Sequence, residues 1–205
     1  MKRTLSALMA LFGSFGLLSG NGRASEIPKD PIYVVIDNGW MGLYAHKDEY
    51  AVFSFTGKGI KIEDAYHISL RQGLGMMVTF AERKEFGNGA DLLTDHARWE
   101  LNHWRSHADR VESVTRGDLS GTRQDLRITG IRLYRNSGER MTVYLIGLAS
   151  KEGVFVLSIS PGDQSTDPLV KEIARSFKLV PRTLGPDEVA KVARAVKNEA
   201  KPKAQ

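Results

Sequence analysis

The chain contains no cysteine, which excludes both a disulfide framework and a lipid anchor attached through a cysteine. It also lacks any run of about 20 apolar residues, the length that a helix needs to span a bilayer, and this excludes stable membrane insertion. The fold must therefore be held by a hydrophobic core alone. The 205 residues are enough for one domain with a core of its own.

An apolar run near the N-terminus covers Leu5–Leu18. Two basic residues precede it, and after it Gly22 and Ala24 place small side chains at the two positions that a signal peptidase reads. This pattern predicts a signal peptide over residues 1–24, cleaved after Ala24, and hence a periplasmic or secreted protein. A polar lead over residues 25–31 is expected to open the mature chain.

The net charge of the chain is also small. Cleavage would remove three of the 29 basic residues and none of the 24 acidic ones, which lowers the net charge from +5 to +2. Nucleic-acid-binding proteins carry a strong basic excess on one face, because counterion release from phosphates drives their affinity. The mature chain does not have this excess, so we expect no nucleic-acid partner.

Hydrophobic periodicity indicates mostly β-structure. Residues 32–55 alternate apolar and polar side chains around Asn38-Gly39, a dipeptide typical of hairpin turns. Further strands are predicted at 76–80, 111–115, 123–134, 140–148 and 154–160. Turns that contain glycine, at 136–138 and 151–153, join the last three strands, so these strands should pair antiparallel.

Two helices are predicted. The first covers Ala90–Arg110 and has Asp91 in its first turn, where the helix dipole favours an anion. Its core stripe comprises Leu93, Ala97, Leu101, Trp104 and Ala108. The second helix begins at Asp167 and ends before Pro181. Residues 182–205 are expected to form a charged tail that is partly helical or disordered.

The segment 141–180, MTVYLIGLASKEGVFVLSISPGDQSTDPLVKEIARSFKLV, comprises a strand, a charged turn, a strand, a loop and a helix. Together with the order of elements over residues 32–181, it resembles the PsbP-like group, which includes the photosystem II extrinsic subunit and Mog-type proteins. The resemblance implies a single α+β domain in which an antiparallel sheet is flanked by helices, an αβα sandwich. It also implies a non-enzymatic accessory role in a larger assembly.

Residues with metal-binding chemistry lie on the first predicted helix. His103 and His107 have the spacing of helical zinc sites, and Glu100 lies one turn before His103 as a carboxylate ligand. A divalent metal such as zinc is the cofactor that this set would hold. In the alternative interpretation these residues line the border between core and solvent, and no cofactor is expected.

Two further surfaces are candidates for binding. Trp99 falls near the polar side of the same helix, beside Leu92. Because tryptophan is enriched in interface hot spots, the two are predicted to form a partner-binding patch. Arg123, Arg127 and Arg135 share strand parity, and they are predicted to line one sheet face that attracts an anion or an acidic partner. The alternative for the arginines is an ordinary solvated face.

Nucleophilic catalysis finds little support, because Ser120 and Ser158 lack the sequence context of a nucleophile elbow. We therefore expect an exported, non-catalytic accessory or partner-binding module. Its expected partner is another exported or membrane-associated protein. A periplasmic metal-binding protein is the alternative interpretation, and a hydrolase is the third.

Overall fold

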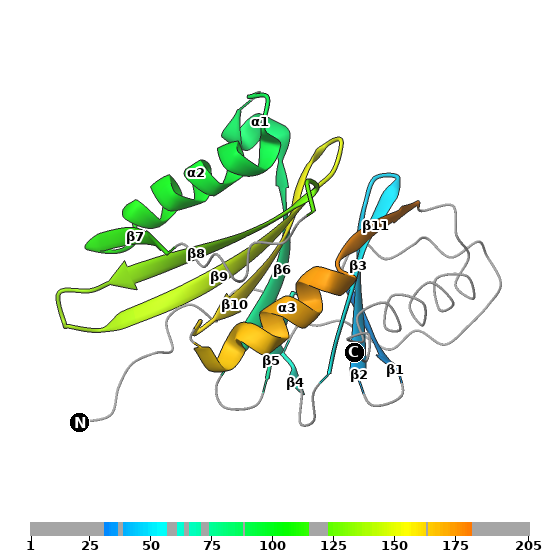
Figure 1. Cartoon of the computed structure of the whole chain (residues 1–205), viewed down its shortest axis with the longest axis horizontal. Coiled ribbons are helices and arrows are strands. Elements are labelled where there is room, and N and C mark those ends of the chain that lie inside the picture. The colour runs from blue at the N-terminus through cyan, green and yellow to red at the C-terminus, as the bar shows by residue number, and fades with distance from the viewer. Residues whose placement is uncertain are drawn as a thin grey trace.

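The computed structural model describes residues 31–36, 39–56, 61–63, 66–70, 74–87, 89–114, 123–162 and 164–181. The predicted signal peptide and the predicted C-terminal tail lie outside these residues. The described residues form two antiparallel sheets with α-helices packed on them, which is an α+β fold (Figure 1). None of the described helices is long and apolar enough to cross a membrane.

The larger sheet has seven strands in the order β4-β5-β6-β10-β9-β8-β7. They are β4 (Lys61–Ile62), β5 (His67–Ser69), β6 (Gly75–Glu82), β7 (Arg110–Val114), β8 (Leu126–Tyr134), β9 (Arg140–Ala149) and β10 (Gly153–Ser160). β8, β9 and β10 pair antiparallel in sequence order, which confirms the predicted hairpins. Gly138 in the β8–β9 turn has a φ of 84°, a conformation that glycine adopts without strain.

The smaller sheet has four strands in the order β1-β2-β3-β11. They are β1 (Ile32–Ile36), β2 (Gly39–His46), β3 (Glu49–Thr56) and β11 (Lys178–Pro181). β1 and β2 form the predicted hairpin, but Ile36 lies opposite Gly39, so Gly39 is the first residue of β2 and not part of the turn. A second hairpin joins β2 to β3, and there Lys47 takes a positive φ of 48°. Asp48 is the only turn-favouring residue there, a weaker signal than Asn-Gly.

One face of the larger sheet is covered by α1 (Arg83–Phe86) and α2 (Leu92–Arg105) (Figure 1). The predicted core stripe of α2 is confirmed: Leu93 and Ala97 are buried, and the rest of the stripe packs partly buried against the same cluster. α2 ends short of the predicted Arg110, because Arg110 already belongs to β7. The short helix α1 is not signalled by the sequence.

The other face of the larger sheet is covered by α3 (Asp167–Ser176) and by the smaller sheet (Figure 1). A short 3-10 turn, Gln164–Thr166, leads into α3. Val170, Ile173 and Phe177 are each 0% exposed, and they pack with buried residues from both sheets. This face therefore holds the better-sealed part of the core.

The end of α3 differs from the prediction. The helix ends at Ser176, and the residues before Pro181 form β11, whose Lys178 lies opposite Val52 of β3. Ser176 would come opposite Ser54 in the same register. Its hydroxyl accepts a 2.8 Å hydrogen bond from Ser54 N and donates to Ser54 O at 3.0 Å. The side chain thus replaces the backbone partner that Ser54 would have in a longer strand.

The sequence predicts one antiparallel sheet, whereas the described strands divide between two. The difference arises in the N-terminal hairpins, which pair with β11 rather than with the meander of β8, β9 and β10. Both kinds of sheet give the same alternation of buried and exposed residues, so periodicity alone does not distinguish them. The α+β class and the antiparallel pairing are confirmed.

Candidate functional site

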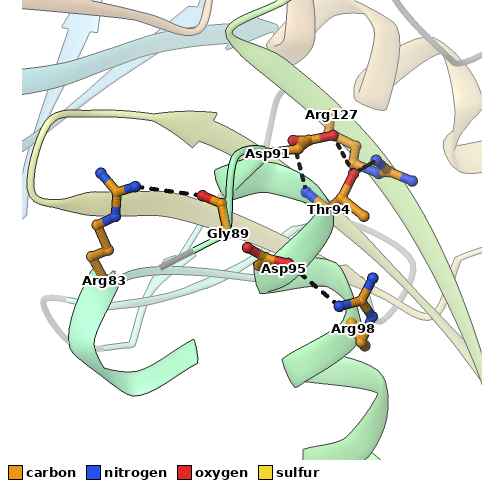
Figure 2. A network of polar contacts seen from close by, with 7 residues as sticks. All are labelled: Arg83, Gly89, Asp91, Thr94, Asp95, Arg98 and Arg127. Carbon is orange, nitrogen blue, oxygen red and sulfur yellow. Dashed lines mark hydrogen bonds and ion pairs between the residues drawn. The ribbon is translucent and has the colours of Figure 1, made fainter. Parts of the chain in front are cut away.

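The start of α2 is fixed by a network of polar contacts (Figure 2). Asp91 is the N-cap, and its carboxylate accepts a 3.1 Å hydrogen bond from Thr94 N and another from the Thr94 hydroxyl. Arg127 of β8 donates to the same hydroxyl oxygen at 2.6 Å. The hydrogen bonds from Thr94 lower the pKa of Asp91. The cap is therefore ionised at neutral pH, where it both stabilises the helix end and links it to β8.

The connection between α1 and α2 is tightly packed around Gly89. Arg83 of α1 donates to Gly89 O at 3.5 Å, and Asp95 of α2 lies so close that a Cβ at Gly89 would come 1.9 Å from its Oδ2 (Figure 2). Arg98 Nη1 lies 3.4 Å from the other oxygen of Asp95. This packing holds Phe86, the last residue of α1, against the side of α2.

A row of aromatic rings starts at Phe86 and continues along α2. The ring centroids are 5.3 Å apart for Phe86 and His96, 5.9 Å for His96 and Trp99, and 5.7 Å for Trp99 and His103. His103 and His107 continue the row at 4.6 Å. His96 is buried, Trp99 is half-buried and the last two histidines are exposed. The row therefore leads from the core to the surface at the C-terminal end of α2.

Glu100 contacts the buried histidine of this row, His96. Its Oε1 lies 3.4 Å from His96 Nε2, and the two side chains are 14% and 4% exposed. The structure does not gather Glu100, His103 and His107 into the predicted three-ligand site. Among the described residues, no group of three or more His, Cys, Asp or Glu side chains is placed to hold a metal.

The imidazole of His107 has a defined hydrogen-bonding role. Its Nδ1 lies 3.0 Å from His103 O and 2.9 Å from the hydroxyl oxygen of Ser106. A carbonyl oxygen only accepts, and the Ser106 hydroxyl already donates to His103 O at 2.6 Å. With the Ser106 hydroxyl proton on His103 O, these contacts favour the neutral tautomer of His107 that carries its proton on Nδ1 and leaves the lone pair on Nε2.

Trp99 differs from the other two tryptophans. Trp40 and Trp104 pack against the two hydrophobic core clusters, whereas Trp99 is a member of neither cluster among the described residues. It contacts rings on both sides, with Phe86 at 6.5 Å and His103 stacked at an interplanar angle of 18°. Leu92, the other residue of the predicted patch, packs partly buried on the α2 side of the core. Both residues are half-buried, and Trp99 is the one that does not pack on either core cluster of the described residues.

The three predicted arginines do not share one face. Arg127 contacts α2, as described above, whereas Arg123 donates at 2.5 Å to Phe177 O on the opposite side of the larger sheet. Arg135 pairs with Glu139 at 3.7 Å. The prediction is wrong because strand parity holds only within a strand, and both Arg123 and Arg135 lie outside β8.

A second group of titratable residues lies where turns of the two sheets meet. The ring of His46 in β2 stacks on Phe80 in β6, with centroids 3.7 Å apart, and the neighbouring Lys47 pairs with Glu152 in the β9–β10 turn. A groove of about 370 Å³ lies between these turns and β11. Burial lowers the pKa of His46, and the charge of Lys47 lowers it further, against the opposing effect of nearby carboxylates.

Sequence reasoning missed the burial of His96 and the position of His46. His96 is covered by Phe86, which sits in the unpredicted helix α1. His46 acquires its environment from Phe80 in the other sheet, and no sequence spacing connects the two. The chain matches no protein-family model, no curated protein and no solved structure.

Proposed function

We propose that the chain is an exported, non-catalytic accessory module that binds another exported or membrane-associated protein through the outer side of α2. The observation that supports this proposal is the position of Trp99. It lies half-buried between two other rings and outside both core clusters of the described residues. Trp104, which is also half-buried, packs against the core cluster on the α2 side, whereas Trp99 does not.

The row of rings prepares Trp99 for binding. Contacts with Phe86 and His103 restrict its rotamers before a partner arrives, so less side-chain entropy is lost on association. Tryptophan combines a large apolar surface with an N–H donor, which is why it is frequent among interface hot spots. Trp99 is therefore the anchor of the proposed interface.

The charges around the anchor favour an acidic partner surface. Arg98 and Arg105 are both exposed on α2. Arg98 lies near Asp95, whereas Arg105 donates at 2.8 Å to the neutral side chain of Asn102. We propose a partner protein with an apolar pocket for Trp99 and carboxylates at its rim, because complementary charges at a rim speed association and fix orientation.

We also propose that the chain belongs to the PsbP-like group, whose fold is consistent with this role. An antiparallel sheet with helices on both of its faces supports the proposal (Figure 1). The four-stranded second sheet is an addition to the expected pattern. The accessory role that the resemblance implies agrees with a binding surface on α2.

The test compares Trp99→Ala with Met141→Ala. Met141 of β9 is an exposed large hydrophobic residue at 40%, so it controls for loss of apolar surface in general. Partners that copurify with the tag-free chain from the source cells are identified by mass spectrometry. The affinity of each purified partner for the three proteins is then measured by calorimetry.

We expect Trp99→Ala to weaken binding roughly 30-fold, the effect of losing about 2 kcal/mol at a hot spot. Met141→Ala should bind as the parent chain does. Equal binding by all three proteins would show that the interface lies elsewhere. A partner lost equally in both variants would point to nonspecific hydrophobic capture.

A further inference from the structure

His103 and His107 remain as an exposed pair once Glu100 is assigned to His96. Both imidazoles lie at the surface, at the C-terminal end of α2, with ring centroids 4.6 Å apart. No polar side-chain partner is found for the His103 ring within the described ranges, and His107 uses only its Nδ1. The pair is therefore open to a ligand from solvent.

The separation of the rings matches that of two imidazoles bound to one ion. A metal–nitrogen bond of about 2.0–2.1 Å places each ring centroid roughly 3.2 Å from the metal. At bond angles of about 90–110° the two centroids are then roughly 4.5–5.2 Å apart. The observed 4.6 Å lies within this range, so the spacing of the two rings is compatible with one shared ion.

The contact of His107 Nδ1 with His103 O suits a metal ligand that binds through Nε2. A hydrogen bond from Nδ1 to this carbonyl orients the ring and leaves Nε2 available. Metal-bound histidines usually donate their other N–H to a carbonyl or carboxylate in this way, which orients the ligand and raises its basicity. The backbone of the helix end thus supplies the outer support of the site.

We propose that His103 and His107 form a two-histidine surface site for a divalent transition metal. Imidazole suits copper, nickel and zinc, and the general order of affinities places Cu²⁺ first. Water completes the coordination, because the nearest following carboxylate, Asp109, already accepts hydrogen bonds from Asn136 at 2.7 and 2.8 Å. This inference goes beyond the proposed partner-binding function and does not depend on it.

The experiment titrates Cu²⁺ into the tag-free, metal-stripped chain by calorimetry, with electron paramagnetic resonance to detect bound nitrogen. His103→Ala and His107→Ala are the test variants, and His67→Ala, an exposed histidine on β5, is the matched control. We expect one ion per chain, bound at least 10-fold more weakly by each test variant and unchanged in the control. Circular dichroism shows whether each variant is folded.

The tautomer gives an independent readout that needs no metal. Nitrogen-15 correlation spectra of the metal-free chain should show the proton of His107 on Nδ1, and Zn²⁺ should shift the ring signals of His103 and His107 but not of His96. Unchanged Cu²⁺ affinity in both test variants would overturn the proposal, and so would the absence of uptake. Partner binding is measured in chelator, so its failure is distinguishable from failure of the metal site.

Discussion

α2 and α3 cover opposite faces of the same seven-stranded sheet, but they are packed to different depths. Val170 and Ile173 of α3 are 0% exposed, and the smaller sheet closes over them. Leu93 and Ala97, the best-buried apolar residues of α2, are each 7% exposed, and the stripe beyond them is only partly buried. The core stripe of α3 is therefore sealed more completely than that of α2, although α3 also keeps exposed residues such as Arg175.

The difference separates stability from recognition. A helix packed against both sheets has less of its surface available for contact with other molecules than a helix packed against one sheet. On α2 the available surface carries Trp99, His103 and two arginines. Substitutions on α3 should therefore reduce the free energy of unfolding, and substitutions on the outer side of α2 should mainly change binding.

The largest effect is expected from Phe177→Ala, at the C-terminal end of α3. The ring is 0% exposed and packs edge-on against Phe53, with centroids 5.9 Å apart. Its removal leaves a cavity and should lower the free energy of unfolding by about 3–5 kcal/mol, measured in urea. Leu101→Ala on α2 should lower it by about 2 kcal/mol or less, because Leu101 is only partly buried. Equal decreases in the free energy of unfolding for the two variants would contradict the proposed difference between α2 and α3.

A smaller decrease in the free energy of unfolding is expected from Ser176→Ala. This substitution removes the hydroxyl that pairs with both backbone groups of Ser54. The buried N–H of Ser54 would then lose this partner, at about 1–3 kcal/mol. Ser106→Ala provides the control at the end of α2, where the hydroxyl is exposed. It should change the free energy of unfolding by less than about 0.5 kcal/mol. A neutral Ser176→Ala would show that water replaces the hydroxyl.

Asp91→Ala should destabilise α2 by about 1 kcal/mol through loss of its N-cap, whereas Asp91→Asn should retain most of the stability. The pKa of Asp91 is lowered in the folded state. Its contribution is therefore present above the ordinary range of an aspartate carboxyl, and it is lost as the pH falls through the lowered folded-state value. At acidic pH the melting temperature of Asp91→Asn should fall less steeply with decreasing pH than that of the parent chain. An equally steep fall in both proteins would argue against an ionised cap.

The smallest effect concerns His46, which stacks on Phe80 at the margin of the α3 side. Burial lowers its pKa below the ordinary 6.5. The unfolded chain therefore takes up the proton first, so stability is complete above 6.5 and declines as the pH falls from 6.5 towards the folded-state pKa. His46→Phe keeps the stacked ring without the titration. Its stability should vary less than that of the parent between pH 7.5 and 5.5, measured by thermal unfolding.

The sequence predicts local structure well where a residue type carries the signal. Asn38-Gly39 and Gly138 mark their hairpins, and Asp167 marks the start of α3. The end of α3 has no such marker, because no glycine or proline stands at residues 176–178 and a single strand-favouring residue, Phe177, is too weak a signal. The division into two sheets depends on long-range pairing, which periodicity does not encode.

The candidate site was predictable only in part. The spacing of His103 and His107 identifies the exposed pair, and the polar-side position of Trp99 identifies the tryptophan that packs on neither core cluster of the described residues. The i,i+4 spacing on the predicted helix places Glu100 beside His96, but the burial of the pair is not visible in the sequence, because it follows from the cover that Phe86 gives to His96. A four-residue helix such as α1 is too short for periodicity to reveal.

The closing strand of the smaller sheet sets the order in which the molecule can be completed. Ser54 and Ser176, which meet at the end of β11, are 122 residues apart. During synthesis the hairpins of β1, β2 and β3 leave the ribosome long before their last neighbour is made. Until β11 is made, the edge of β3 that it will pair with stays unpaired. Contacts between residues so far apart in the sequence raise the contact order, and high contact order slows folding. A chain truncated just before Lys178 should therefore be synthesised but should not reach the native fold.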